Sequence, residues 1–141
     1  MRARKSQDLI YAGLGVIAMD LDSKYSIDKE VKFEPLTVID IPNIIEGCKK
    51  EWQNISLTNV NDCVVRLGVI HGEFHWHKHD AEDEFFYVVG GLLMIDLEDR
   101  TVEIKPGQGF MVSRGIRHRT RTPVRTAILM VEGNTVSAVG D

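Results

Sequence analysis

A chain of 141 residues with a formal net charge of -4 has room for one domain with a single hydrophobic core. Its composition, 43% hydrophobic and 27% charged, is that of an ordinary globular protein and argues against extended disorder. The acidic balance argues against a nucleic-acid partner, because phosphate binding normally requires a clustered basic surface. Cys48 and Cys63 form no CxxC pattern, so we expect no zinc ribbon, and the protein is predicted to be reduced and cytoplasmic.

Residues 1–30 are predicted to form an N-terminal extension, and residues 31–141 a single domain. The extension imitates a signal peptide, because the basic start MRARK precedes the apolar run LIYAGLGVIAM at 9–19. Asp8 and Asp20 flank this run, no small-x-small cleavage site follows, and the run is shorter than the roughly 20 residues that span a membrane. We therefore expect no membrane partner, and Met19 is an alternative start of the native chain.

The first half of the domain carries weak signals, and the second half carries strong ones. The apolar run TVIDIPNII at 37–45 is broken by Pro42, and a short helix or turn is predicted around residues 44–52. From residue 60 onward, segments of strand length rich in valine and isoleucine alternate with glycine and proline turns. These segments are 64–74, 83–91, 92–100, 101–109, 109–118 and 125–133. The pattern predicts an all-β sandwich or barrel, with its core over residues 60–132.

The sequence HWHKHDAEDEFF at 75–86 places three histidines at alternate positions. In an extended strand, His75, His77 and His79 share one face, and Trp76 and Lys78 share the other. The alternation that follows places Glu84 on the same face as Phe86 and Val88. A carboxylate among apolar side chains needs a partner or a cation, so this parity favours an inward-facing site.

A fourth histidine lies in GIRHRTRT, where Ile116, His118 and Thr120 alternate with three arginines. The cationic face requires solvent or a partner, so His118 is expected on the interior side. Three imidazoles and one carboxylate form a ligand set suited to iron, manganese, nickel or zinc, with coordination positions left open for a substrate. Two alternatives remain: a histidine-rich polar strand without metal, and a slipped pair of His75 and His77 acting with Glu82.

These residues resemble the two motifs of the cupin family. The first motif, G(x)5HxH(x)3-4E(x)6G, is matched by Gly72, His77, His79, Glu84 and Gly91, with one residue too few between Gly72 and His77. The second motif, G(x)5PxG(x)2H(x)3N, is matched in spacing by Gly107, Ser113, Gly115, His118 and Thr122, with serine in place of proline and threonine in place of asparagine.

The resemblance implies a double-stranded β-helix, or jelly roll, of the small single-domain kind. It also implies one divalent metal bound by His77, His79, Glu84 and His118, and a homodimer. The two substituted motif positions are not ligands in the family pattern, so they leave the substrate class open more than they affect metal binding.

His75 lies two positions before the motif and has two readings. It either hydrogen-bonds a ligating side chain and fixes its orientation, or it serves as a catalytic general acid or base. The function hypothesis is a metal-dependent enzyme acting on a small polar molecule, of the sugar isomerase or epimerase type or the dioxygenase type. The alternative is a non-catalytic module of the same fold that binds or senses a small ligand.

Overall fold

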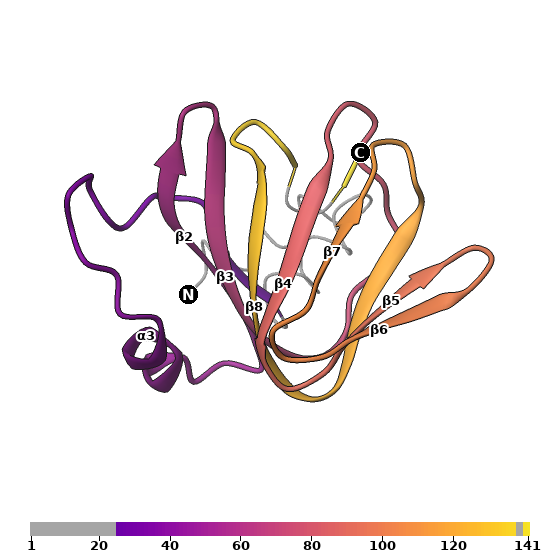
Figure 1. The fold of residues 1–141 in the computed structure, drawn as a ribbon, viewed down its shortest axis with the longest axis horizontal. Helices are drawn as coiled ribbons and strands as arrows, with labels where there is room; N and C mark the ends of the chain where they lie inside the picture. Colours follow the sequence, from indigo (N-terminus) through magenta and orange to yellow (C-terminus); the bar gives the residue numbers. More distant parts are fainter. Residues whose placement is uncertain (1–24, 138–139) are drawn as a thin grey trace, which may run out of the picture.

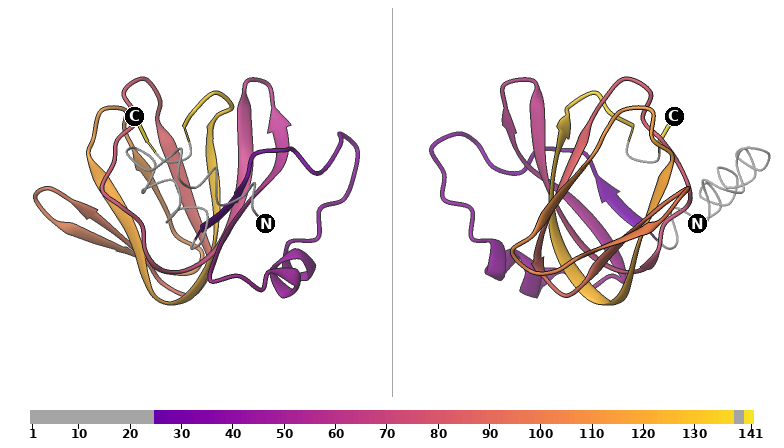
Figure 2. Two further views of the ribbon diagram at one scale, coloured as in Figure 1. Left: turned by 180° about the vertical axis from the view of Figure 1, so that it is seen from behind. Right: turned by 45° about the vertical axis from the view of Figure 1, so that its right-hand side comes forward.

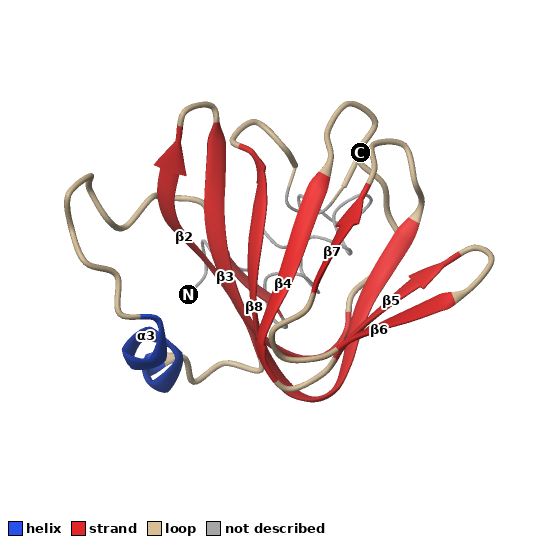
Figure 3. Cartoon of the chain, viewed as in Figure 1, coloured by secondary structure: helices blue, strands red, loops and turns tan. Residues whose placement is uncertain are grey.

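The computed structural model describes residues 25–137 and 140–141. The predictions for the signal-peptide-like run and for the alternative start at Met19 lie outside these residues. Across the described ranges, the secondary structure consists of β-strands and one short helix (Figure 3). The all-β fold class is confirmed.

Eight strands form one curled sheet (Figure 1). The strands are β1 (Tyr25–Asp28), β2 (Trp52–Val60), β3 (Cys63–Glu73), β4 (Glu84–Gly90), β5 (Leu93–Leu97), β6 (Thr101–Ile104), β7 (Gly109–Val112) and β8 (His118–Gly133). Their order is β1-β2-β3-β8-β4-β7, and β5 pairs with both β6 and β8. The right-hand turned view shows the β5–β6 hairpin running at a steep angle to the β2–β3–β8–β4 strands (Figure 2). The sheet curls around an interior without closing into a complete barrel, as β1 and β7 end the path unpaired with each other.

The long strand β8 joins the two parts of this sheet. Its first residues, His118 to Arg121, pair with β5, whereas Ala127 to Glu132 lie between β3 and β4. The register shifts on β3 between Ile70 and Gly72 and on β4 between Val88 and Gly90, opposite the point where β8 changes partners. Such irregularities increase the bend of a strand, so they allow β8 to serve both parts.

Two hydrophobic cores lie on opposite faces of β3. The inner core contains Ile70 together with Phe86, Leu93, Ile95 and Ile128. The outer core contains Leu67 and Val69, which are covered by apolar side chains of residues 33–45. Burial on both faces explains why β3 has an almost continuous apolar sequence.

The helix α3 spans Ile41–Gly47, earlier than the range 44–52 predicted from the sequence. Asp40 caps its N-terminus by accepting a 3.2 Å hydrogen bond from the Asn43 N–H, and Pro42 occupies the first turn. Both are common helix-start residues, so the true boundary was present in the sequence as a capping signal. Residues from Trp52 onward instead form β2, a strand that the sequence reading missed.

The strand β1 pairs in parallel with β2, from Tyr25 opposite Trp52 to Asp28 opposite Ile55. It falls within the residues predicted as an extension, so the sheet begins before residue 31. No helix across the described ranges has both the length and the apolar character needed to cross a membrane.

Candidate metal centre

The histidine segment is positioned by the start of β8. Residues between β3 and β4 do not form a continuous strand, but His77 forms an isolated antiparallel bridge with His118. The His77 N–H donates to the His118 carbonyl at 2.9 Å, and the His118 N–H donates to the His77 carbonyl at 2.8 Å. A further bond from the Gly115 N–H to the His79 carbonyl, 2.8 Å long, holds the next turn of this loop. The two motifs therefore meet through their backbones.

Three side chains of the first motif lie close together. His77, His79 and Glu84 each offer one ligand atom, and these atoms all lie within 4.8 Å of one another. His118 joins the group: its Nε2 lies 3.6 Å from Oε1 of Glu84, and the His79 Nε2 lies 3.4 Å from the same oxygen. The structure thus brings together the four predicted ligands from the loop, β4 and β8.

The polar atoms at this point lack hydrogen-bond partners. His79 Nε2, Glu84 Oε1 and His118 Nε2 are buried, and none of them has a partner within the described part of the chain. Buried polar atoms are normally satisfied, and leaving one unpaired costs about 1–3 kcal/mol. Three such atoms facing one point are therefore the arrangement of donor atoms expected around a bound cation.

Backbone carbonyls select the ring tautomers that suit metal binding. His77 Nδ1 lies 3.0 Å from the His75 carbonyl, and His118 Nδ1 lies 2.9 Å from the Ile116 carbonyl. Because a carbonyl only accepts, each Nδ1 carries the hydrogen and each Nε2 keeps its lone pair. Metal-ligating histidines usually have this arrangement, in which the second ring nitrogen donates to a fixed acceptor.

The distances also fit a bound ion. Two ligand atoms each about 2.1 Å from a common metal are about 3.0–3.4 Å apart when adjacent in octahedral or tetrahedral coordination. The observed separations of 3.4 and 3.6 Å from Glu84 Oε1 are close to this range. The donor set, its burial and its spacing all fit a divalent transition metal.

The pKa values reflect the crowding of these groups. Burial lowers the pKa of His77 to about 4, so its ring is neutral at physiological pH. Burial also opposes protonation of His79, but the adjacent Glu84 carboxylate raises its pKa above the ordinary value. Burial opposes ionisation of Glu84, yet His118 and His79 hold its pKa well below the usual range. A neutral His77 and an ionised Glu84 are the forms that bind metal.

The site adjoins a cavity of about 40 Å³ inside the curled sheet. The apolar part of its wall consists of Trp52, Ile70, Phe74, Phe86, Ile128 and Met130. The polar part consists of Asn54, His77, Glu84, Thr120 and Glu132. The rings of Trp52 and Phe74 stack with centroids 5.4 Å apart, and the Phe74 centroid is 5.4 Å from that of His77. A continuous aromatic wall thus leads to the candidate metal centre.

Strand parity predicted that His75 faces the interior together with His77 and His79. The structure differs at this position. His75 is exposed, because the segment is a loop at this position, although its ring centroid lies 5.3 Å from that of His77. Its carbonyl is the acceptor that orients the His77 ring. A catalytic role for the His75 side chain stays a prediction.

Glu132 and Arg66 are two residues of this region that the sequence reading missed. Glu132 lies opposite Glu84 in the β4–β8 register and lines the cavity. Its Oε2 is 3.0 Å from Nε of Arg66, and both side chains are 4% exposed. Burial and the charge of Glu84 raise the pKa of Glu132 to about 9, while Arg66 opposes that shift. Strand parity would have revealed Glu132, since Ile128 and Met130 precede it on the same face.

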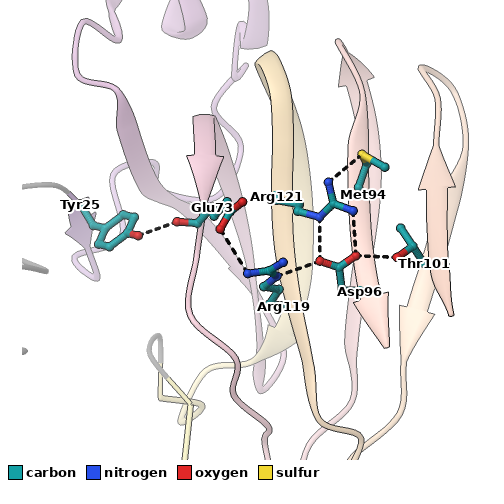
Figure 4. A network of polar contacts seen from close by, with 7 residues as sticks. All are labelled: Tyr25, Glu73, Met94, Asp96, Thr101, Arg119 and Arg121. Atoms are coloured by element: carbon teal, nitrogen blue, oxygen red, sulfur yellow. Dashed lines mark hydrogen bonds and ion pairs between the residues drawn. The ribbon is translucent and has the colours of Figure 1, made fainter. Parts of the chain in front are cut away.

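The arginines near His118 were expected to face solvent or a partner. Arg119 and Arg121 instead bind Asp96 on β5, and Arg119 also reaches Glu73 (Figure 4). Arg117 and Arg119 lie over the Trp76 ring, 5.1 and 5.5 Å from its centroid. Much of this positive charge is therefore used within the fold.

Comparisons with known proteins agree with this architecture. The sequence profile described as Cupin domain matches residues 63–132. The chain is 41% identical to the uncharacterized protein YdbB of Bacillus subtilis over 97 residues, which cover 68% of this chain and 86% of the relative.

Solved structures show the same fold. The crystal structure of a cupin-2 domain containing protein from Shewanella frigidimarina superposes with a TM-score of 0.66 at 26% identity, over 68% of this chain and 94% of that one. KdgF from Halomonas superposes with a TM-score of 0.55 at 16% identity, over 78% of this chain and 94% of that one, and is similar in fold alone. By sequence and by structure, this chain belongs to the cupin family.

Proposed function

We propose that this protein is a metal-dependent enzyme that acts on a small polar molecule, with one divalent ion held by His77, His79, Glu84 and His118. The observation that carries the proposal is the convergence of three buried polar atoms that lack hydrogen-bond partners in the described structure, His79 Nε2, Glu84 Oε1 and His118 Nε2. A bound ion would supply Lewis-acid polarisation of a carbonyl or enediol, or activation of dioxygen.

The cavity beside the site supports a small substrate. Its volume of about 40 Å³ exceeds the roughly 10–15 Å³ that a single water molecule needs, so it admits a small polar group. A complete monosaccharide requires the wall to open, whereas a short hydroxyketone, diketone or hydroxy acid needs less movement. The sugar isomerase or epimerase type and the dioxygenase type both remain within the proposal, and the cavity favours the smaller substrates of each.

The chain's own groups would orient such a molecule. The carboxyl of Glu132, the hydroxyl of Thr120 and the amide of Asn54 line the cavity, and the Asn54 Oδ1 is buried without a hydrogen-bond partner in the described structure. An acceptor in this position favours a substrate that carries a hydroxyl or amino group. The apolar wall of Trp52, Phe74 and other residues would exclude water from the reacting atoms.

The test is metal analysis of protein purified without affinity tags or chelators, followed by an activity screen in air and under anaerobic conditions. Stoichiometric iron, nickel or manganese with oxygen consumption would support the dioxygenase type. Turnover of sugars or hydroxyketones without oxygen would support the isomerase type. His79→Ala and His118→Ala should each remove the metal and keep the β fold, and metal retained by both variants would refute the proposal.

A second candidate is a binding or sensing module that holds a small ligand without turnover. It is favoured by the same cavity, which is small and offers apolar and polar side chains for contact with a ligand. Metal retention with no turnover across sugars and diketones would favour this candidate, because the site would then be assembled but inactive.

We also propose that the protein forms a homodimer in the cytoplasm. The dimer is supported by an apolar outer face of β4, where Phe85, Tyr87 and Val89 are exposed beside Met111 of β7. Contiguous exposed apolar side chains on a sheet face are typical of an interface. Sedimentation analysis of Tyr87→Lys should show a monomer if this face pairs with a second copy. The location is supported by Cys48 and Cys63, which are both free thiols.

A further inference from the structure

The segment Gly140–Asp141 lies against the loop that carries His77 and His79, although it is outside the residues matched by the family profile. The Asp141 N–H donates to the Lys78 carbonyl at 2.8 Å. In return, the Asp80 N–H donates to the Asp141 carboxylate at 2.6 Å. Two hydrogen bonds in opposite directions therefore join this segment to the backbone on either side of His79.

Gly140 contacts His77 directly. A Cβ atom at position 140 would lie 2.5 Å from the His77 Cβ and 2.9 Å from Cγ and Cδ2 of the ring. The residue also has a φ of +95°, a conformation that side chains with a Cβ rarely adopt. Only glycine fits here without displacing His77.

The loop from His77 to Asp80 is held on two sides. The start of β8 provides one side, through the paired bonds of His118 with His77 and through Gly115. Gly140 and Asp141 provide the other. Ligand atoms must stay within about 0.5 Å of the productive geometry, so a loop without regular strand pairing needs this kind of support.

We propose that Gly140 and Asp141 are positioning residues of the metal centre. They hold the backbone of Lys78 and Asp80 and the ring of His77, and so keep the His77 and His79 nitrogens directed at the common point. This inference rests on the proposed function, because positioning has meaning only if the centre binds metal. Partners that orient metal ligands typically contribute 10–100-fold to metal affinity.

The experiment measures Co²⁺ binding to the full chain by visible absorption and by competition with a chelator. Gly140→Ala should weaken Co²⁺ binding by about 10–100-fold and change the absorption spectrum, because His77 is displaced. The matched control is Gly107→Ala, whose φ of +84° carries the same backbone strain but whose Cβ would meet no atom within 4 Å. That control should bind Co²⁺ within about twofold of wild type.

The Asp141 contact is tested separately, since Gly140→Ala alone could perturb folding. Asp141→Ala removes the acceptor of the Asp80 N–H and should weaken Co²⁺ binding by about 10-fold. Asp141→Asn keeps an oxygen acceptor and should restore most of the affinity. Asp99→Ala, at an exposed site on the β5–β6 turn, should leave the affinity unchanged. Without metal, the Asp80 amide should exchange hydrogen faster in Asp141→Ala than in wild type.

The outcomes separate the two proposals. If wild type fails to bind Co²⁺ or any other divalent transition metal, the proposed function is refuted, and the positioning role is refuted with it. If wild type binds Co²⁺ and both Gly140→Ala and Asp141→Ala bind it equally well with unchanged spectra, the positioning role alone is refuted. Weaker binding in these two variants, with normal binding in Gly107→Ala and Asp99→Ala, supports it.

Discussion

Two carboxylates in this molecule are buried to a similar extent and have opposite surroundings. Asp96 on β5 is 5% exposed and Glu84 on β4 is 7% exposed. Both have a pKa below the usual range: hydrogen bonds led by Arg121 lower that of Asp96, and the imidazoles of His118 and His79 overcome burial at Glu84. Burial and the direction of the pKa shift therefore do not distinguish them.

Hydrogen bonding does distinguish them. The two oxygens of Asp96 accept four hydrogen bonds, from Nε of Arg119, Nε and Nη2 of Arg121, and the hydroxyl of Thr101 (Figure 4). The Glu84 Oε1 accepts none within the described structure, and its close neighbours include two imidazole nitrogens. A buried carboxylate with satisfied oxygens joins strands, whereas one whose oxygen faces imidazole nitrogens without a hydrogen bond indicates a site for a cation.

The largest effect is expected at a third buried carboxyl group, that of Glu132, which lies opposite Glu84 and contacts Arg66. Glu132→Met should lower the free energy of unfolding by about 3–5 kcal/mol, because the Arg66 guanidinium cannot lose its proton and would be left buried without the carboxyl oxygen that lies 3.0 Å from its Nε. Chemical denaturation measures this change. Arg66→Met should cost less, since burial and the neighbouring Glu84 already favour the protonated, neutral form of Glu132 by raising its pKa.

The double variant Arg66→Met with Glu132→Met supplies the control for that pair. It should recover most of the stability lost in Glu132→Met, because no charge then remains buried at this place. Equal losses in the two single variants, with no recovery in the double variant, would mean that volume rather than charge governs the region.

Metal addition should give the next largest effect. A divalent ion at about 100 times its Kd should raise the free energy of unfolding by about 2.7 kcal/mol, because it binds only the folded protein. The gain should appear in wild type and in Asp96→Asn, and it should be absent in His118→Ala. Thermal unfolding with and without metal measures it, and an equal gain in His118→Ala would place the bound ion elsewhere.

Neutralising each carboxylate in metal-free protein tests the comparison directly. Asp96→Asn should lower the free energy of unfolding by about 1.5–3 kcal/mol, because it weakens hydrogen bonds to charged arginines. Glu84→Gln should lower it by less than Asp96→Asn does, because two imidazole nitrogens at 3.4 and 3.6 Å favour the ionised carboxylate less than the hydrogen bonds from two arginines favour that of Asp96. Urea denaturation of the two variants gives both values, and a larger loss in Glu84→Gln would contradict the assignment.

The sequence predicted much of the fold from residue 60 onward, because the strands there either alternate apolar and polar side chains or are apolar along most of their length. The positions of Glu84 and His118 followed from parity with Phe86 and with the arginines. The strand β2 was missed, because Gln53, Asn54, Ser56 and Thr58 interrupt its apolar pattern. Its burial depends on packing against residues 33–45, which local sequence does not reveal.

Within the site, strand alternation predicted the direction of a side chain correctly where the chain forms a strand, and incorrectly where it forms a loop. His77 and His79 reach the interior through the bridge to His118 and the bend of the loop, whereas His75 does not. The contact of Gly140 with His77 joins positions 63 residues apart, and no local pattern could indicate it. A contact between residues so far apart in the chain becomes visible only in the folded structure.

Acid titration should separate the two carboxylate regions with the smallest but most specific effects. The folded pKa of His77, about 4, lies below its ordinary value of 6.5, so the unfolded chain takes up a proton first. The stability that His77 contributes to metal-free protein is thus present above pH 6.5 and is lost as the pH falls toward 4. His77→Gln should lack this loss, and bound metal, which competes with protons, should delay it.

Asp96 should act in a lower pH range. Its folded pKa is depressed, so its contribution is present above the unfolded value of about 3.9 and is lost only as the pH falls below it. The stability difference between wild type and Asp96→Asn should therefore be constant from about pH 5 to 7 and shrink below about pH 4, with or without metal. Unfolding curves measured across this pH range, with and without metal, test both claims. If metal changed the pH range over which Asp96 loses its contribution, or left that of His77 unchanged, the two regions would not be the separate kinds of site described above.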